Sequence, residues 1–327
     1  MKKNILFTIF TSCVVLLSIK GVNALEINDG VYENQHGITM TLEQINNLRS
    51  LQFTDEQISR MTLDEFDMNK DLTGILVSSD TNYYKTSYIP KNAVTYGLND
   101  SNYYIVNEEI SEEEYNNSEI SLLANCGTGD SCWQTEYKKL QTSIVQVGDQ
   151  YRFRSDITWS QPPQTRSNDI LAMAFNSTNI SPVATSKYAR YDWHMTRYDE
   201  ELRSWYDDVG GTTFNSNHSN WRIDLGGYSV IMDLKNDEIS ADGEHIDQVW
   251  NQSAYMYFNV MKSTNVVIYV LDVYGSYQHA QTNVSLSSLA QVILDPSAYN
   301  IITFAGDISE EYDNMRKTHA QLSGIAW

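Results

Sequence analysis

The chain lacks a second long apolar segment, and it is poor in cysteine and in basic residues. Its 327 residues include 3 Cys, and 22 Lys and Arg stand against 42 Asp and Glu, which gives a formal net charge of −20 at pH 7. A surface of this charge repels phosphate backbones and anionic lipids, so nucleic acid is excluded as an expected partner. The same charge keeps a protein soluble and does not by itself indicate a specific ligand.

The single apolar run lies at the N-terminus, where it predicts an export signal. Two lysines precede the run, which covers Ile5–Ile19, and small side chains at Val22 and Ala24 fit the pocket of a signal peptidase. A run of about 15 residues is shorter than the roughly 20 that a membrane-spanning helix needs. We therefore expect residues 1–24 to be a cleaved signal peptide. The mature protein is then secreted or extracellular, either released or loosely associated with the cell surface, and without a stable membrane span. An uncleaved N-terminal anchor is the alternative.

Two cysteines remain after this segment, and they lie close together in the sequence. Cys126 and Cys132 enclose Gly-Thr-Gly-Asp-Ser. In an oxidising compartment such a pair predicts a disulfide that closes a small loop, and the glycines supply the flexible backbone that a tight ring needs. No Cys or His pair has the spacing typical of a zinc site, so we predict no metal and no cofactor.

A repeated Thr pattern predicts helix starts early in the mature chain. The pairs are Thr41 with Gln44, Thr54 with Gln57, and Thr62 with Glu65. In such a capping box each side chain satisfies a backbone N–H that the first helical turn leaves without a partner. We expect a small helical unit, with short helices at about 41–70, within an N-terminal region covering residues 25–106. The glutamate-rich residues 107–125 are expected to form an acidic, solvated linker.

From residue 126 onward, strand patterns dominate. Gly148-Asp149 lies between two alternating segments and predicts a hairpin, and Val266–Val273 is a nearly continuous apolar run, as in a strand buried on both faces. No regular alternation of strand and helix is present, which disfavours an open parallel α/β sheet. The predicted fold class is mainly β: a jelly-roll-like β-sandwich at 126–327, preceded by the small helical N-terminal unit.

Gly129-Asp130-Ser131 is the most suggestive catalytic motif, and it resembles the nucleophile block of the Gly-Asp-Ser esterases. Asp242-Gly-Glu-His245 resembles the closing block of that family, which implies Ser131 as nucleophile and His245 as base. However, Ser131 lies between the paired cysteines, and the strand–helix alternation of the esterase fold is missing. We therefore expect a protein that is not an enzyme, with hydrolysis by Ser131 and His245 as the alternative.

Aromatic residues cluster in the middle of the β region. We expect Tyr191, Trp193, Trp205 and Tyr206 to be binding residues, because exposed Tyr and Trp stack on sugar rings or grip a protein partner. The alternative is that half of these aromatic residues belong to the core. Two further tryptophans are expected in the core: Trp159 and Trp250.

Several scattered stretches carry a resemblance to known sequences. They are Phe53-Thr-Asp-Glu-Gln-Ile58, Asn69-Lys-Asp-Leu72, Ile157-Thr-Trp159, Arg166-Ser-Asn-Asp-Ile170 and Tyr274-Gly-Ser-Tyr-Gln-His-Ala280. With these the chain resembles uncharacterised exported proteins of low-GC Gram-positive bacteria (Firmicutes), a family with no known activity. The resemblance implies bacterial secretion and supplies no site residues.

These patterns together predict a secreted bacterial protein that binds a carbohydrate or a protein outside the cell or at the cell surface. The serine hydrolase described above is the alternative. A third hypothesis is that residues 25–125 form a pro-segment that is released by proteolysis within the acidic stretch.

Overall fold

The computed structural model describes residues 25, 30–90, 103–118, 135–160, 163, 165–199, 201–224, 226–239, 245–263, 265, 267–289, 292–299, 301–304, 311–313 and 315–323. The chain divides into two compact units, Met1–Leu72 and Thr73–Trp327. No helix in these described ranges is long and apolar enough to cross a membrane.

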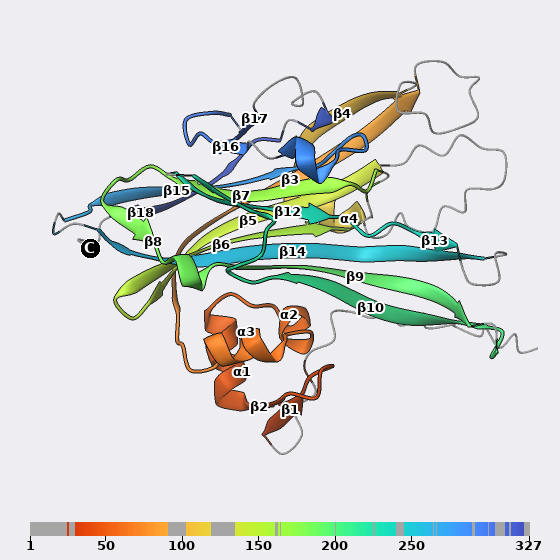
Figure 1. Cartoon of the computed structure of the whole chain (residues 1–327), viewed down its shortest axis with the longest axis horizontal. Helices are drawn as coiled ribbons and strands as arrows, with labels where there is room; N and C mark the ends of the chain where they lie inside the picture. The colour runs from red at the N-terminus through yellow and green to blue at the C-terminus, as the bar shows by residue number, and fades with distance from the viewer. Residues whose placement is uncertain are drawn as a thin grey trace, which may run out of the picture. The chain divides into compact units, whose positions relative to one another are not determined.

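The first unit combines a two-stranded ribbon with three short helices (Figure 1). Its elements are β1 (Val31–Glu33), β2 (Thr39–Thr41), α1 (Leu42–Ser50), α2 (Asp55–Ser59) and α3 (Leu63–Asn69). The predicted capping boxes at Thr41 and Thr54 are confirmed, since both reciprocal hydrogen bonds are present at each. At Thr62 the side chain accepts a hydrogen bond from the backbone N–H of Glu65. The helices bury an apolar core: Met40, Ile45, Leu48, Leu51, Phe53, Ile58, Met61 and Phe66.

The second unit contains a large antiparallel sheet, with nine strands among the described residues. Its strands are β3 (Ile75–Pro90), β4 (Tyr103–Ile110), β5 (Thr135–Val147), β6 (Gln150–Trp159), β8 (Ile180–Pro182), β9 (Tyr188–Asp199), β10 (Ser204–Phe214), β13 (Glu238–Ile239) and β14 (Ile246–Lys262). The main order is β10-β9-β14-β6-β5-β3-β4, and both β8 and β13 pair with β14. The predicted hairpin at Gly148-Asp149 is confirmed, because Val147 pairs with Gln150 across it.

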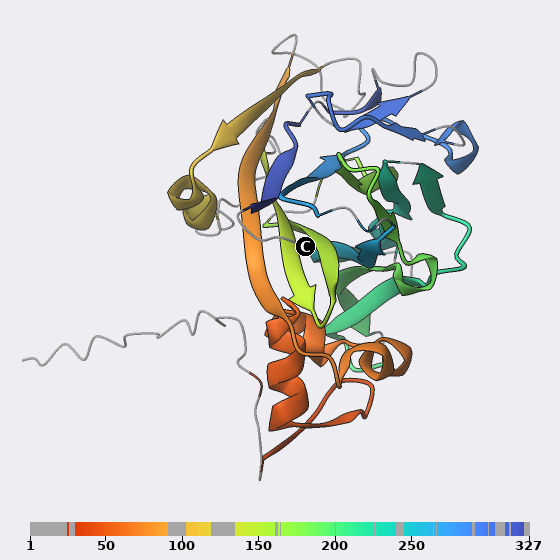
Figure 2. The ribbon, with the colours of Figure 1, turned by 90° about the vertical axis from the view of Figure 1, so that its left-hand side faces the viewer.

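A second, five-stranded sheet faces the first (Figures 1 and 2). Its order is β11 (Trp221–Asp224), β12 (Gly227–Asp233), β7 (Asn168–Phe175), β15 (Val270–Gln278) and β18 (Thr318–Ser323). The remaining elements described are α4 (Glu112–Ser118), the paired strands β16 (Val292–Leu294) and β17 (Ile302–Phe304), and the 3-10 turns η3 (Ala184–Ser186) and η4 (Leu286–Leu289).

One apolar core joins the two sheets. Phe153 of the large sheet contacts Phe175 of the small sheet with 5.9 Å between ring centroids, and Phe258 contacts Tyr228 at 4.8 Å. Trp159 is fully buried in this core, as predicted. At Gly227 the backbone has a φ of +156°, and a Cβ there would collide with the carbonyl oxygen of Met173. Strands thus dominate the chain, and the prediction of a mainly β protein is confirmed.

The division of the chain differs from the predicted one. The units separate after Leu72, whereas we expected a boundary in the acidic residues 107–125. The reason is strand pairing: β3 runs alongside β5 from Ile75↔Gln146 to Ser87↔Thr135, and β4 pairs with β3 (Figure 2). Part of the expected linker is the helix α4, in which Tyr115 is buried and its ring lies 5.2 Å from that of Tyr83.

Candidate functional site

Among the side chains that the structure describes, the large exposed aromatics of the large sheet lie on β10 and β14, which flank β9 at one edge of the sheet. In the pairing of β10 with β9, Trp205 lies opposite Tyr198 and Val209 lies opposite His194. On the other side of β9, Trp250 of β14 lies opposite His194. Successive residues of a strand point to opposite faces of a sheet, so these side chains share one face. We call this surface the aromatic face and define it by six residues: His194, Tyr198, Trp205, Val209, His245 and Trp250.

The rings of the aromatic face form two groups. In the first, His245 stacks on Tyr198 with centroids 3.7 Å apart and an interplanar angle of 16°, and the ring of Trp205 meets both at steep angles. In the second, His194 and Trp250 lie 4.4 Å apart at 31°. The two groups are four residues apart along β9, which is roughly 13 Å in a strand. The aromatic face therefore offers two ring platforms on one rigid surface.

Polar groups lie between the two platforms. Thr196 accepts a hydrogen bond from Trp250 Nε1 at 3.1 Å and donates one to Asp207 Oδ1 at 3.0 Å. Gln248 pairs with Thr196 across β14 and β9, and its side chain is exposed. Carboxylate and amide groups beside flat rings can orient a ligand that combines apolar faces with hydroxyl groups.

The aromatic face is exposed to solvent. Trp205 is 50% exposed, Val209 40% and Trp250 38%. Scattered exposed apolar residues are ordinary, but several large exposed rings on adjacent strands make this face a candidate interaction surface. The tip nitrogen of Trp250 is already bonded to Thr196, so its ring is fixed in place before any ligand arrives.

The four residues predicted to bind are divided between the two faces of the sheet. Trp205 belongs to the aromatic face, whereas Tyr206, the next residue, points to the opposite face and is 48% exposed. Tyr191 is only 1% exposed; its hydroxyl donates to Gln252 Oε1 at 2.6 Å and accepts from the N–H of Lys235 at 2.9 Å. Burial raises the pKa of Tyr191, as expected for a structural side chain in the core. Tyr191 is therefore not available to a ligand at the surface.

Trp193 occupies the face opposite to Trp205, where it lines a pocket. Its ring lies 5.1 Å from that of Tyr191 and covers Gly210, a position where a Cβ would collide with the indole. The pocket has a volume of about 400 Å³, and its walls also include Phe214, His218 and Lys235. Lys235 forms an ion pair with Glu238, which also lines the pocket. The pocket thus has one aromatic wall and a mixed polar lining.

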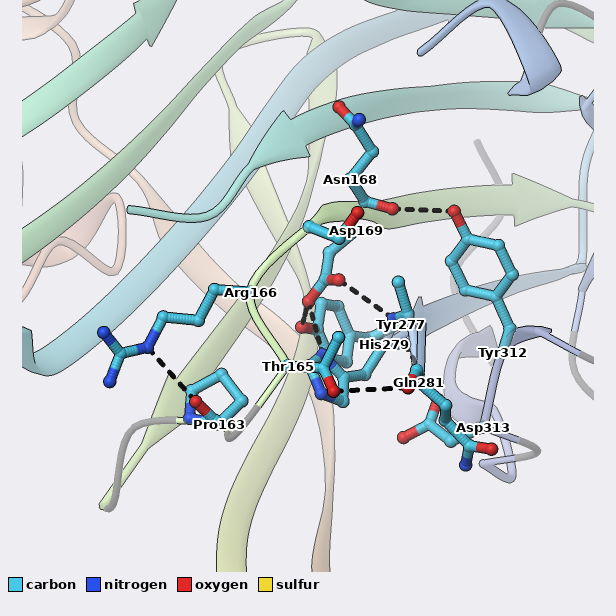
Figure 3. Close-up of polar contacts among 12 residues, drawn as sticks. Pro163, Thr165, Arg166, Asn168, Asp169, Tyr277, His279, Gln281, Tyr312 and Asp313 are labelled. Atoms are coloured by element: carbon cyan, nitrogen blue, oxygen red, sulfur yellow. Dashed lines mark hydrogen bonds and ion pairs between the residues drawn. The ribbon is translucent and has the colours of Figure 1, made fainter. Parts of the chain in front are cut away.

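A cluster of buried charges lies between the two sheets (Figure 3). His279 Nδ1 lies 2.8 Å from Asp169 Oδ2, and the hydroxyl of Tyr277 donates to the same carboxylate. All three residues are fully buried. Burial raises the pKa of Asp169, and the contacts with His279 and Tyr277 offset this only in part. Burial lowers the pKa of His279, but Asp169 and Glu136 outweigh it, so the net pKa is raised. No solvent reaches these groups, so they are not a surface catalytic site.

Only His245 of the two residues proposed for serine hydrolysis lies in the described part of the chain. Ser131, Cys126 and Cys132 lie outside the described residues. His245 is described, and its ring is stacked on Tyr198 in the aromatic face. Among the residues that the structure describes, no group of three or more His, Cys, Asp or Glu is placed to hold a metal ion.

No protein-family model matches the chain, and no curated protein matches it significantly. The function must therefore be argued from the residues themselves.

The sequence pattern missed part of the aromatic face. Trp250 was predicted to lie in the core, but it is 38% exposed, so that prediction was wrong. The strand alternation could have predicted this exposure, because Val249 and Trp250 are successive residues of one strand and point to opposite faces of the sheet. Since Val249 is buried, Trp250 lies on the exposed face. The stacking of His245 on Tyr198 had no sequence signal, since the two residues are distant in the chain.

Proposed function

We propose that this chain is a secreted, non-enzymatic binding protein that holds a neutral carbohydrate on its aromatic face, outside the cell or at the cell surface. The observation that carries the proposal is the pair of exposed ring platforms, around Trp205 and around Trp250, on three adjacent strands. Indole and phenol rings present flat apolar faces, and a sugar ring presents a flat face of C–H groups that packs against them.

The surroundings of the platforms support a carbohydrate over other ligands. Thr196, Asp207 and Gln248 place hydrogen-bonding groups between the rings, which suits hydroxyl-rich chains better than a wholly apolar partner. The chain carries a net charge of −20, which disfavours an anionic polymer. The separation of the platforms, roughly 13 Å along β9, suits a short stretch of an extended polysaccharide.

The rigidity of the surface is a second support. The rings sit on paired strands and contact one another, so little conformational entropy is lost when a ligand binds. A preformed aromatic surface of this kind can hold a ligand by stacking, without making or breaking any covalent bond of the ligand. For that reason the proposal is a binding function and not catalysis.

Depletion from solution by insoluble polysaccharides tests the proposal. The wild-type protein and the variants Trp205→Ala and Trp250→Ala are incubated with cellulose, chitin and xylan, and the bound fraction is measured over a range of polysaccharide concentrations. We expect binding to at least one of these polymers. Loss of one stacked ring at a cost of about 1.4 kcal/mol should weaken binding about tenfold in each variant.

The matched control is Tyr269→Ala, which removes an exposed aromatic side chain outside the aromatic face. It should bind as the wild type does. Binding that survives both tryptophan substitutions, or that is lost equally in the control, would contradict the proposed surface. If the chain bound a protein but none of the polysaccharides, the ligand of the aromatic face would be a protein and not a carbohydrate.

The serine hydrolase remains a second hypothesis with less support. His245 packs against Tyr198 and Trp205, and Ser131 lies outside the described residues, so only the sequence motif supports this hypothesis. Ester and peptide hydrolysis by the wild type and by Ser131→Ala separates the hypotheses, because activity that disappears with this substitution would favour catalysis.

The proposal includes export and a particular fold for the second unit. The apolar run after Lys2 and Lys3 and the resemblance to exported Firmicutes proteins support secretion, with a disulfide between Cys126 and Cys132. The two facing sheets support a jelly-roll-like sandwich following a small helical unit. N-terminal sequencing of protein recovered from culture medium should begin at Leu25. An intact N-terminus would contradict cleavage, and a start near residue 126 would instead indicate a released pro-segment.

A further inference from the structure

A lysine, an aspartate and a glutamate meet in the interior of the second unit, out of reach of solvent. Lys138 and Glu136 are alternate residues of β5 and point to the same side, and Asp313 comes from the segment just before β18. Lys138 and Glu136 are 0% exposed and Asp313 is 1% exposed. Lys138 Nζ lies 2.7 Å from Asp313 Oδ2 and 3.6 Å from Glu136 Oε2.

The carboxyl group of Asp313 is held in a fixed orientation. Its Oδ1 accepts the backbone N–H of His279 at 2.8 Å, and its own N–H donates to the carbonyl oxygen of His279 at 3.0 Å. One carboxyl oxygen therefore faces the amine of Lys138, while the other faces a backbone donor. The N–H of His279 is placed to stabilise negative charge that develops on Oδ1.

Glu136 is held at the amine from its other side. Its Oε1 accepts a hydrogen bond from the hydroxyl of Tyr88 at 2.6 Å, and its Oε2 is the oxygen nearest to Lys138 Nζ. The Glu136 carboxylate is thus directed at the amine and can take up a proton from it.

A plain ion pair explains this arrangement poorly. Removing charged groups from water is expensive, and buried ion pairs are often no more stable than apolar side chains of the same volume. Burial lowers the pKa of Lys138, but Asp313 and Glu136 outweigh it, so the amine carries its proton when the site first forms. Conversion of the ammonium and the carboxylate to an amide would remove both buried charges.

We propose that Lys138 and Asp313 are joined by an intramolecular amide bond that forms after folding, with Glu136 transferring the protons. Nζ gives a proton to Glu136, and its lone pair then attacks Cγ of Asp313. Charge develops on Oδ1, where the N–H of His279 holds it. A second Nζ proton leaves, and both protons combine with Oδ2, which departs as water.

The step is balanced without any co-reactant. An ammonium group and a carboxylate become one amide and one water molecule; the third Nζ proton remains on the amide nitrogen, and Glu136 is regenerated. The carboxyl group needs no separate activation, because the fold holds it in contact with the amine in a site that excludes water.

The intact mass of the folded full chain tests the proposal. The protein is reduced and alkylated before measurement, so that a disulfide does not contribute to the mass, and its N-terminus is determined separately. We expect a mass lower by one water molecule than the mass calculated for the unlinked chain. Tryptic digestion should yield a branched peptide that contains both Lys138 and Asp313.

Four variants make the test specific. Asp313→Asn should still form the bond, now with release of ammonia, and should end at the same mass as the linked wild type. Lys138→Arg keeps the positive charge but cannot form the amide, so its mass should be that of its full sequence. Glu136→Gln should remain largely unlinked. Lys139→Arg, at the neighbouring position on the other side of β5, should retain the loss of one water.

A folded wild-type protein with the mass of its full sequence and no branched peptide overturns the proposal, whatever the variants do. A loss of water that persists in Lys138→Arg also overturns it, because the bond would then lie elsewhere. Rapid linkage in a folded Glu136→Gln variant contradicts the role of Glu136. Circular dichroism spectra identify any variant that has failed to fold.

Discussion

Two His–Asp pairs among the described residues of the second unit allow a direct measurement of what burial does to the same interaction. Asp169 and His279 are fully buried, with Nδ1 and Oδ2 separated by 2.8 Å. Asp272 and His319 are also 2.8 Å apart, but the His319 side chain is 44% exposed. Asp169→Asn and Asp272→Asn therefore make the same chemical change at the same distance in two different environments.

The expected magnitudes differ widely. Asp169 also accepts the hydroxyl of Tyr277 and, at 2.9 Å, the backbone N–H of Ala280, so its replacement leaves several buried donors badly matched. Breaking a buried charge pair by removing one partner typically costs about 3–5 kcal/mol. The partly exposed pair is expected to be worth about 0–1 kcal/mol, because water solvates the His319 ring, which is 44% exposed.

Urea denaturation at pH 7, followed by tryptophan fluorescence, measures both effects. With a slope of about 3 kcal/mol per molar urea, Asp169→Asn should lower the midpoint by about 1 M or more, and Asp272→Asn by about 0.3 M or less. Equal shifts in the two variants, or a larger shift in Asp272→Asn, would refute the argument that burial of the network makes it important for stability.

Three further predictions concern His279, Thr54 and the contact between Lys138 and Asp313. The pKa of His279 is raised above 6.5, because its acidic neighbours outweigh the effect of burial. The stability that this raised pKa confers is complete below pH 6.5 and is lost as the pH rises through the raised pKa. Denaturation midpoints should therefore fall with increasing pH in the wild type and not in His279→Gln. Thr54→Ala removes a confirmed capping box and should cost about 1 kcal/mol in thermal unfolding, whereas Thr54→Ser should cost little. Lys138 and Asp313 are 175 residues apart in the sequence, so a covalent link between them would close a long loop and lower the entropy of the unfolded chain. The linked protein should therefore be more stable than Lys138→Arg by about 5 kcal/mol. Equal urea midpoints for the two proteins would count against the link.

Local features of the fold could be predicted from the sequence because they depend on neighbouring residues. The capping boxes at Thr41 and Thr54 and the hairpin at Gly148-Asp149 each involve side chains or turns within a few positions. The burial of Trp159 follows in the same way from the alternation of β6. The extent of β3 could not be predicted, because its Tyr-rich and Asn-rich sequence becomes a strand only through its pairing with β5.

The sites depend on residues that the fold brings together from far apart. Lys138 and Asp313 are 175 positions apart, and Asp169 and His279 are 110 apart, so only the strand register places them in contact. The aromatic face could be predicted from the sequence in part, less well than the local features and better than the buried clusters. The sequence predicted Trp205 to be an exposed aromatic residue, and it is 50% exposed. The sequence could not show that Tyr206 lies on the opposite face or that Trp250 shares the face of Trp205.

The most direct test of carbohydrate binding on the aromatic face is a titration observed at the tryptophan side chains. In NMR spectra of the nitrogen-15-labelled protein, soluble oligosaccharides of the polymer that the protein binds are added stepwise, and the indole N–H signals are followed. The account predicts that the signals of Trp205 and Trp250 shift, while that of Trp159 in the core stays in place. Shifts confined to Trp193 would locate the ligand in the pocket on the opposite face, and this would contradict the account.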